Sequence, residues 1–456
     1  MNSAAILRVA FMAWEFPRMK LSLIFAVAAI SDFAGAPSPE PAAVGAGFEV
    51  ERYAVSLTPD PAERSVAGTE AITVRSLRDG LHRVVFSPNA LIIDAATVDG
   101  RPAQVRSDES GIAVALPAPL ANRHTVEIVL RYHGVPRRGV TATAGSMYTS
   151  YFACDWMVCL QDAPGDKAMF ALDLRVPAEM TTLAVGRMAG RTKPRNGEVT
   201  HRWRSARAYS PYLFGFAVGR FTHTSVRSGG GVLDHYGEGA TASELTRLFA
   251  ETPRMVAFFS AKAGLPLPGG RYAQLLVPGR EAQEAATYSL IGRGELERGA
   301  ADPSSDWVIA HELAHQWWGN LVTAETWQDF WLNEGIATFM TAAWKEHRFG
   351  APAYRAELDT ARARLRRAEE AGWDRPLAFA GAYPNLGTRR AIQYSKGALF
   401  MDHLRTVLGE EAFWAGLRAF TRAHAGGSVT SIHLQRAMEQ AADRDLSPVF
   451  RAWVFG

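Results

Sequence analysis

The segment HELAH at residues 311–315 constrains the fold of this chain more than any other feature. Its two histidines are four positions apart, so on a helix His311 and His315 project from one face and can share a metal ion. Glu312 then lies beside that ion, and Glu334 can add a third ligand from a second helix. Two histidines and one glutamate leave one coordination position open, as in catalytic zinc sites, whereas structural sites have four protein ligands. We therefore predict one catalytic Zn²⁺ per chain.

The residues around this segment argue against a chance match. Residues 307–310 before it and 316–319 after it are mostly apolar, and the pattern predicts a helix over residues 306–319. A buried helix that directs two histidines and a glutamate inward is costly unless something pairs with them. A metal ion is such a partner.

This part of the chain also resembles a known family. Residues 311–340 are similar to the zinc aminopeptidases related to aminopeptidase N and leukotriene hydrolase, which are gluzincin metallopeptidases. The resemblance continues in YSKGA at residues 394–398, which matches the family's Tyr-x-Lys-Gly-Ala segment, and extends more loosely over residues 50–456. It implies a zinc aminopeptidase that hydrolyses N-terminal residues from peptides with a free N-terminus.

Two residues are expected to carry the chemistry. Glu312 is placed to take a proton from a water that the zinc activates, and later to donate a proton to the leaving amine. By resemblance, Tyr394 donates a hydrogen bond to the oxyanion of the tetrahedral intermediate. The alternative for Tyr394 is an ordinary half-buried tyrosine on an apolar helix face.

An aminopeptidase must also bind the free α-ammonium group of its substrate. The family uses a Gly-x-Met-Glu-Asn segment before the zinc helix, and the nearest match here is EAQEA at residues 281–285. The family's glutamate aligns with Glu284, whereas Glu281, Gln283 and Ala285 replace its glycine, methionine and asparagine. Because a buried carboxylate near zinc suits an ammonium group, we expect Glu284 to bind substrate. The alternative is a surface glutamate.

The family's second amine contact comes from the β domain, and here the chain departs from the family. The corresponding region is residues 148–156, ahead of QDAP at residues 161–164. The expected glutamine or glutamate is missing. Tyr151 or Phe152 occupies its place, and Asp155 is a candidate substitute. The preferred first residue of the substrate therefore stays open.

The pattern along the chain predicts an α+β protein. Strand-like runs such as residues 53–57, 84–86, 112–116 and 126–130 alternate with turns rich in Gly, Pro, Asp and Asn, which indicates an antiparallel β domain. Helical periodicity then predominates, over residues 306–319, 333–346, 352–370, 391–407, 409–424 and 430–442. By resemblance, a saddle-like β domain precedes a thermolysin-like domain with a mainly helical C-terminal lobe.

The N-terminus has the parts of a secretory signal peptide. Lys20 precedes an apolar run over residues 21–30, and a small-x-small cleavage site follows at residues 34–36. Met19 is an alternative start. We expect a periplasmic or secreted protein; an uncleaved anchor is the alternative, although the run is short for a membrane span and no stable insertion is expected.

Four segments are therefore expected along the chain. They are a signal peptide over residues 1–36, a linker over 37–46, an N-terminal β domain over 47–227 and a zinc peptidase domain over 228–456, the last beginning at a Gly-rich boundary.

Composition excludes one class of partner and leaves one question open. With 21% charged residues and a net charge of +3, the 456-residue chain has no basic surface typical of nucleic-acid binding. Cys154 and Cys159 are its only cysteines. In an exported protein they can pair, so a disulfide and two free thiols are both consistent with the sequence.

Larger relatives continue past the point that corresponds to Gly456, so we expect a short form without their C-terminal domains and with a more open cleft. Two other functions remain as alternatives: a zinc endopeptidase on the same scaffold and a non-catalytic binding module. Acetylation of a test peptide separates the endopeptidase from the aminopeptidase, and zinc content tests the binding module. The oligomeric state is not predicted.

Overall fold

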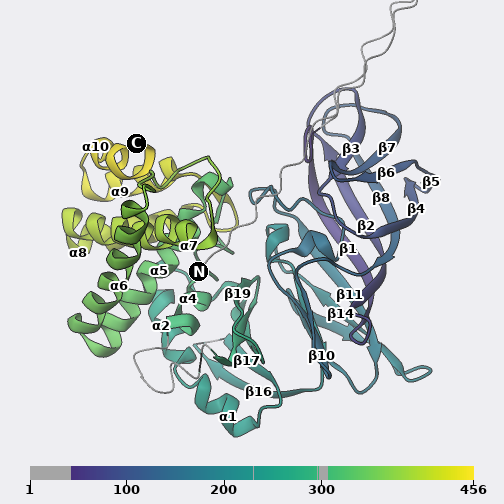
Figure 1. The fold of residues 1–456 in the computed structure, drawn as a ribbon, viewed down its shortest axis with the longest axis horizontal. Coiled ribbons are helices and arrows are strands. Elements are labelled where there is room, and N and C mark those ends of the chain that lie inside the picture. Colours follow the sequence, from purple (N-terminus) through teal and green to yellow (C-terminus); the bar gives the residue numbers. More distant parts are fainter. Residues whose placement is uncertain (1–42, 230, 295, 297–306) are drawn as a thin grey trace, which may run out of the picture. The chain divides into compact units, whose positions relative to one another are not determined.

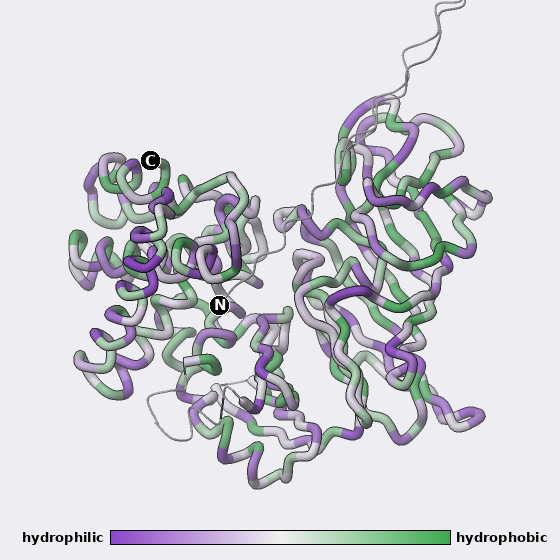
Figure 2. The backbone as a smooth tube through the Cα atoms, viewed as in Figure 1, coloured by the Kyte–Doolittle hydropathy of each residue, from purple (hydrophilic) through white to green (hydrophobic). Residues whose placement is uncertain are grey.

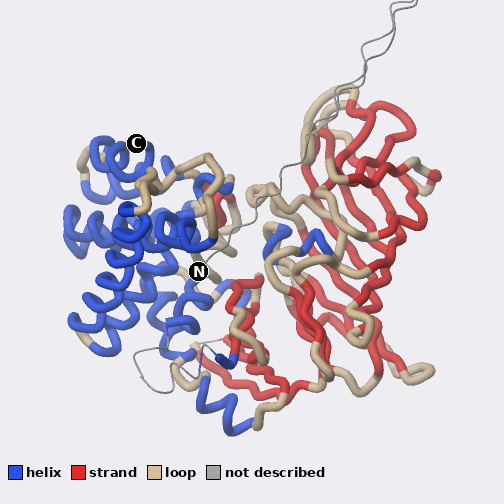
Figure 3. Tube along the Cα trace, in the orientation of Figure 1, coloured by secondary structure: helices blue, strands red, loops and turns tan. Residues whose placement is uncertain are grey.

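The computed structural model describes residues 43–229, 231–294, 296 and 307–456 (Figure 1). The expected signal peptide and most of the 37–46 linker lie outside these residues. Within them, strands predominate in the first part of the chain and helices in the second (Figure 3), which confirms the α+β class. No helix in the described ranges is long and apolar enough to cross a membrane.

The first fifteen strands form three sheets. Their orders are β13-β14-β11-β1-β2-β8-β4-β5, β12-β15-β10-β9 and β3-β7-β6. The bounds are Phe48–Asp60 (β1), Ser65–Ser76 (β2), Leu81–Phe86 (β3), Ile92–Val98 (β4), Arg101–Pro102 (β5), Val105–Asp108 (β6), Gly111–Leu120 (β7), Thr125–Gly134 (β8), Val140–Ala142 (β9), Ser146–Thr149 (β10), Met169–Pro177 (β11), Thr181–Ala184 (β12), Arg187–Arg191 (β13), Glu198–Arg204 (β14) and Phe216–Gly219 (β15).

These sheets are antiparallel, as predicted, with one exception. Strand β1 pairs in parallel with β11, so that Arg52 lies opposite Met169 and Leu57 opposite Leu174. A parallel pair needs a long connection, and the many strands between β1 and β11 provide it. The pairing could not be predicted from alternation alone, because period-two patterns are the same in both arrangements.

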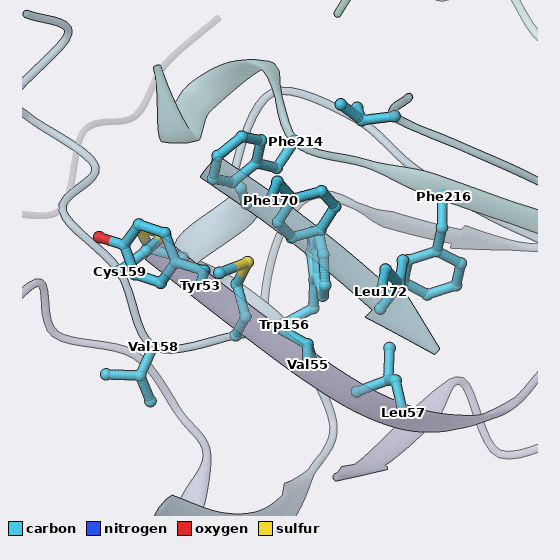
Figure 4. Close-up of a cluster of buried hydrophobic side chains, with 14 of the residues drawn as sticks. Tyr53, Val55, Leu57, Trp156, Val158, Cys159, Phe170, Leu172, Phe214 and Phe216 are labelled. Atoms are coloured by element: carbon cyan, nitrogen blue, oxygen red, sulfur yellow. A yellow bond between two sulfur atoms is a disulfide. The ribbon is translucent and has the colours of Figure 1, made fainter. Parts of the chain in front are cut away.

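Alternation along the strands buries one face of each sheet. Hydrophilic and hydrophobic residues interchange along the backbone (Figure 2), and Tyr53, Val55 and Leu57 of β1 are buried. They belong to an aromatic and aliphatic cluster in which Phe170 stacks on Phe214, with ring centroids 4.2 Å apart (Figure 4). Burial of such rings is the main stabilising contribution to this domain.

The structure pairs Cys154 with Cys159, so of the two alternatives it contains the disulfide. Both cysteines belong to the same buried cluster, in which Cys159 is labelled in Figure 4. The backbone N–H of Val158 donates to Oε2 of Glu70 at 2.8 Å, and Nδ2 of Asn89 donates to the carbonyl of Cys154 at 2.8 Å. The segment that follows Tyr151 is therefore fastened to the domain core at several points.

A fourth sheet, with five strands, has the order β16-β17-β18-β20-β19. Its strands are Phe221–Ser228 (β16), Gly231–Glu238 (β17), Arg271–Val277 (β18), Ala282–Ala285 (β19) and Tyr288–Gly292 (β20). Strand β16 pairs with β17 in antiparallel fashion, with Ser228 opposite Gly231, so the predicted boundary at residue 228 falls at the end of β16. The change of sheet falls between β15 and β16, a few residues before the predicted boundary at residue 228.

Helices make up most of the remainder. They are Ala242–Leu248 (α1), Thr252–Ala263 (α2), Trp307–Ala314 (α4), Trp331–Phe349 (α5), Ala351–Glu370 (α6), Leu386–Arg389 (α7), Gly397–Ala423 (α8), Ser431–Ala442 (α9) and Ser447–Phe450 (α10), with π-helical segments at Arg390–Lys396 (η6) and Arg451–Phe455 (η7). The short strands Thr323–Ala324 (β21) and Ser428–Val429 (β22) pair in parallel.

Three of the predicted helices differ in detail. The helix predicted over residues 306–319 ends at Ala314, because the chain turns there and the backbone N–H of Asn320 bonds back to the carbonyl of His315. The helices predicted over residues 391–407 and 409–424 join as α8, with a break at Gly409, whose φ of 78° is non-helical. A glycine tolerates that conformation without a steric penalty.

Candidate active site

Helices α4 and α5 carry the three predicted metal ligands. His311 lies in the last turn of α4, His315 lies in the turn directly after it, and Glu334 lies in the first turn of α5. All three side chains are buried. Nε2 of His311 is 3.1 Å from Nε2 of His315, and Oε2 of Glu334 is 3.3 Å and 3.4 Å from these two atoms.

These residues fit a zinc ion. Zinc bonds of about 2.0–2.2 Å at tetrahedral angles place ligand atoms roughly 3.3 Å apart, which matches the three separations. Two imidazole nitrogens that face each other repel unless a proton or a cation lies between them. In addition, Oε2 of Glu334 accepts no hydrogen bond within the described residues. A cation bound between His311, His315 and Glu334 answers both requirements.

A further contact orients one of the ligands. Nδ1 of His315 lies 3.0 Å from the carbonyl of Trp318, which fixes the ring so that Nε2 faces the centre. Burial acts to lower the pKa of His315, but the carboxylates of Glu334 and Glu284 outweigh it and raise this pKa to about 10. Conversely, the pKa of Glu334 is held well below its usual range despite burial, because both histidines lie against it. The site is therefore strongly favourable for positive charge.

Glu312 lies between the two histidine ligands and is buried. Its Oε2 has no hydrogen-bond partner in the part of the chain that the structure describes. Burial, together with the nearby carboxylate of Glu284, raises the pKa of Glu312 well above its usual value. A carboxylate with a raised pKa and a free oxygen is a stronger base than an exposed one.

Tyr394 lies on the π-helical segment η6, a type of local structure that is frequent at functional sites. Its ring stacks on His311, with centroids 5.8 Å apart and planes inclined by 11°. Burial and the carboxylates of Glu334 and Glu284 raise the pKa of its hydroxyl well above the usual value, so the hydroxyl remains a hydrogen-bond donor at neutral pH.

Glu284 lies on the edge strand β19, opposite Ser289 of β20. It is only 7% exposed, so the alternative of a surface glutamate does not apply. One of its oxygens lies within 4.8 Å of ligand atoms of both Glu312 and His315. Burial raises the pKa of Glu284 to about 7, with the Glu334 carboxylate adding to the effect and His315 opposing it.

Two amide side chains that the sequence analysis did not single out hold this strand in place. Nε2 of Gln316 and Nδ2 of Asn320 donate to the carbonyl of Ala285, at 3.2 Å and 3.1 Å, and Oε1 of Gln316 accepts from the backbone N–H of Thr287 at 3.1 Å. The turn after α4 thus fastens the residue next to Glu284. The signal was present, since two amides in an apolar stretch need buried partners.

Asp155 does not lie free to receive an ammonium group, and this prediction was wrong. Its two carboxylate oxygens accept from the backbone N–H, Nε and Nη2 of Arg138 at 3.0, 3.2 and 2.9 Å. The aspartate is 4% exposed and is fully engaged in this ion pair. Tyr151 instead lies beside β19, where its hydroxyl donates to the carbonyl of Ala282.

Comparison with known proteins agrees with this geometry. The family model for the peptidase family M1 domain matches residues 294–453, which include the three ligands and Tyr394. The similarity to the M1 peptidase domain thus covers the helical part of the chain that carries the proposed site. The similar solved structures described below are zinc metallopeptidases, which supports zinc as the metal that His311, His315 and Glu334 could hold.

Relatives of this chain include aminopeptidase N of Lactobacillus delbrueckii subsp. lactis, 26% identical over 89% of this chain and 50% of the relative. Leukotriene A-4 hydrolase of Xenopus laevis is 26% identical over 84% of this chain and 67% of the relative. The chain spans about half the length of the aminopeptidase N relatives that it matches.

The fold is that of a two-domain M1 metallopeptidase. The M1 zinc metallopeptidase of Deinococcus radiodurans superposes with a TM-score of 0.77 at 26% identity, over 91% of this chain and 96% of the other. A mutant of the same protein bound to a Tyr-Ser-Ala substrate gives a TM-score of 0.75, over 90% of this chain and 95% of the other.

Proposed function

We propose that this M1 chain is a zinc aminopeptidase that hydrolyses the first peptide bond of peptides with a free N-terminus. The names of the relatives support this activity, as does the tripeptide bound to the Deinococcus radiodurans protein. His311, His315 and Glu334 hold the zinc ion in this proposal, Glu312 and Tyr394 are catalytic, and Glu284 binds the substrate.

The position of Glu284 carries the proposal. Its carboxylate is buried and lies within 4.8 Å of ligand atoms of Glu312 and His315. A buried carboxylate without a cationic partner is costly, and the α-ammonium of a peptide supplies such a partner. An ammonium group held there lies one residue from the bond that the water activated by Glu312 attacks. Only the first peptide bond is therefore positioned for hydrolysis.

The residues act in sequence. When bound, the zinc ion supplies a Lewis acid that polarises the substrate carbonyl and lowers the pKa of a water molecule. Glu312 accepts a proton from the attacking water and then donates it to the departing amine. The hydroxyl of Tyr394 donates a hydrogen bond to the oxygen that becomes negative during attack. Glu284 holds the α-ammonium throughout and orients the carbonyl.

A matched pair of peptides tests the proposal. Both have the same sequence, and one is acetylated at its N-terminus; products are identified by mass spectrometry. We expect the free peptide to lose its first residue and the acetylated peptide to stay intact. Turnover of neither peptide by zinc-loaded protein overturns the proposal.

A paired substitution locates the amine site. Glu284→Gln is expected to lower kcat/KM for the free peptide by roughly a hundredfold or more, because one partner of a buried charge pair is lost, while zinc content stays unchanged. Glu109→Gln, which changes an exposed glutamate of the N-terminal domain, is the matched control and leaves kcat/KM unchanged.

A zinc endopeptidase is the second candidate, and one observation favours it. Asp155 is engaged by Arg138, so this candidate for a second amine contact is not available. The peptide pair separates the two activities, because an endopeptidase cleaves internal bonds in both peptides.

We also propose that the chain is exported and that the mature form begins near Pro37. The signal-like segment within residues 1–36 motivates this, and the disulfide between Cys154 and Cys159 supports it, since disulfides persist mainly in oxidising compartments. N-terminal sequencing of protein from its native host tests the proposal. Soluble protein that keeps Met1 or Met19 overturns it.

A further inference from the structure

Tyr151 of the N-terminal domain is held rigidly in an unusual conformation. Its φ of 59° lies in the left-handed region, which a tyrosine seldom adopts. Three hydrogen bonds hold it there: its backbone N–H donates to Oε1 of Gln283 at 2.8 Å, its hydroxyl donates to the carbonyl of Ala282, and its carbonyl accepts from Nε2 of Gln161 at 3.2 Å. Strained residues that the surroundings fix in this way cluster at functional sites.

The position of this side chain is next to the proposed amine site. Ala282 and Gln283, which bind Tyr151, directly precede Glu284 on β19. Partial burial and the carboxylates of Glu312 and Glu284 raise the pKa of the Tyr151 hydroxyl well above its usual value. Tyr151 nevertheless remains 43% exposed. Because its hydroxyl is engaged, the exposed part offers mainly ring carbon to a ligand.

Two polar groups near Tyr151 are already used. Oε1 of Gln283 accepts from the Tyr151 backbone, and Asp155 is paired with Arg138. The guanidinium of Arg138 also lies over the ring of Phe152, 4.2 Å from its centroid. Phe152 and Asp155 therefore provide no free polar contact beside Tyr151.

We infer that Tyr151 forms a wall of the subsite for the first side chain of the substrate and selects large apolar side chains there, aromatic ones included. The inference rests on the proposed function: an ammonium held by Glu284 places the side chain of the same residue near β19, which the Tyr151 side chain contacts at Ala282. The Glu284, Glu312 and Glu334 carboxylates serve the ammonium, proton transfer and the metal. None of these three is left to pair with a cationic side chain, which would lose its water without compensation.

Two substitutions at Tyr151 test this wall. Tyr151→Asn removes the ring but keeps a residue that tolerates the left-handed backbone; Tyr151→Phe keeps the ring and removes the bond to the Ala282 carbonyl. Met188→Asn is the matched control, because Met188 of β13 is also 43% exposed. The readout is kcat/KM for fluorogenic substrates whose single residue is Phe, Leu, Ala or Lys.

We expect the wild-type enzyme to favour Phe and Leu over Ala and Lys by roughly tenfold or more. Tyr151→Asn is expected to lower kcat/KM for Phe and Leu about tenfold and to leave Ala within about twofold, whereas Tyr151→Phe and Met188→Asn keep the wild-type order. An unchanged order in zinc-loaded Tyr151→Asn, or a wild-type preference for Lys, overturns the inference. Wild-type protein that cleaves none of the four substrates contradicts the proposed function instead.

Product inhibition gives a readout that needs no variant, in case Tyr151→Asn does not fold. Free L-phenylalanine is expected to inhibit the wild-type enzyme at a concentration roughly tenfold lower than L-lysine. The reverse order would show that the wall does not select apolar side chains.

Discussion

Gly335 of α5 and Gly397 at the start of α8 touch through their backbones. A Cβ atom on Gly335 would lie 2.8 Å from Cα of Gly397, and one on Gly397 would lie 2.7 Å from Cα of Gly335. Real carbon atoms do not approach so closely. Glu334 precedes the first glycine, and Tyr394 lies about one helical turn before the second. The contact therefore fixes the separation of a metal ligand from the proposed oxyanion donor.

Gly335→Ala should accordingly damage both stability and catalysis. The added methyl must push the two helices apart, which costs about 1–3 kcal/mol in the free energy of unfolding, and the shift displaces Tyr394 from the reacting carbonyl. Urea unfolding and kcat measure the two effects. Gly190→Ala is the control, because a Cβ atom on Gly190 meets nothing within 4 Å. Equal behaviour of the two variants would show that the close contact has no role.

Glu312→Gln is expected to retain zinc and to lose activity by several orders of magnitude. Glutamine keeps the shape of the side chain but cannot accept a proton from water at neutral pH. Zinc content by elemental analysis and kcat are measured on the same preparation. Substantial turnover by the zinc-loaded variant would remove Glu312 from its role as the general base.

Tyr394→Phe is expected to lower kcat with little change in KM. The hydroxyl is proposed to act on a charge that exists only during reaction, and loss of such a donor costs about 3 kcal/mol, or roughly a hundredfold in kcat. Steady-state kinetics with one aminoacyl substrate separate the two constants. A rise in KM alone would make Tyr394 a residue that binds substrate in the ground state.

Glu70 makes the stability of the N-terminal domain depend on pH. It is fully buried, and burial raises its pKa from 4.5 to about 8, although the backbone N–H of Val158 acts the other way. Between these two values the folded chain keeps a proton that the unfolded chain releases. The stabilisation is therefore complete below the lower value and is lost as pH rises to about 8, by an amount on the order of several kcal/mol.

Urea unfolding of the wild type and of Glu70→Gln at a series of pH values checks this dependence. Glutamine does not titrate, so the free energy of unfolding of the variant should fall less steeply between about pH 5 and about pH 8. Parallel curves would mean that Glu70 is ionised in the folded chain.

The meeting of the His311 and His315 side chains could be predicted because their four-residue spacing on a helix has one geometric outcome. Glu284 was predictable only through the resemblance, since its burial depends on Gln316 and Asn320, which follow far along the chain. The error at Asp155 has a related cause: its partner Arg138 is distant in sequence, and no local pattern signals an ion pair.

In the fold, too, features set by local sequence patterns could be predicted, whereas features set by contacts between distant segments could not. Alternating and helical patterns predicted the strands and most helices, because burial of one face follows from local periodicity. The boundary predicted at residue 228 stays a prediction, because turns between paired strands and linkers between domains share a Gly-rich composition. The parallel pairing of β1 with β11 depends on contacts between distant segments and leaves no local signal.

Zinc titration of metal-free protein is the sharpest test of whether His311, His315 and Glu334 hold one catalytic zinc ion. The chain is stripped with a chelator, zinc is added back in measured amounts, and release of the first residue from a free peptide is followed. We expect activity to disappear on chelation and to return to a plateau at one zinc ion per chain. Glu334→Ala should recover none of this activity, because two histidines leave the ion under-coordinated. Full activity in the stripped protein would show that catalysis does not need the metal, and full recovery by Glu334→Ala would show that Glu334 is not a ligand.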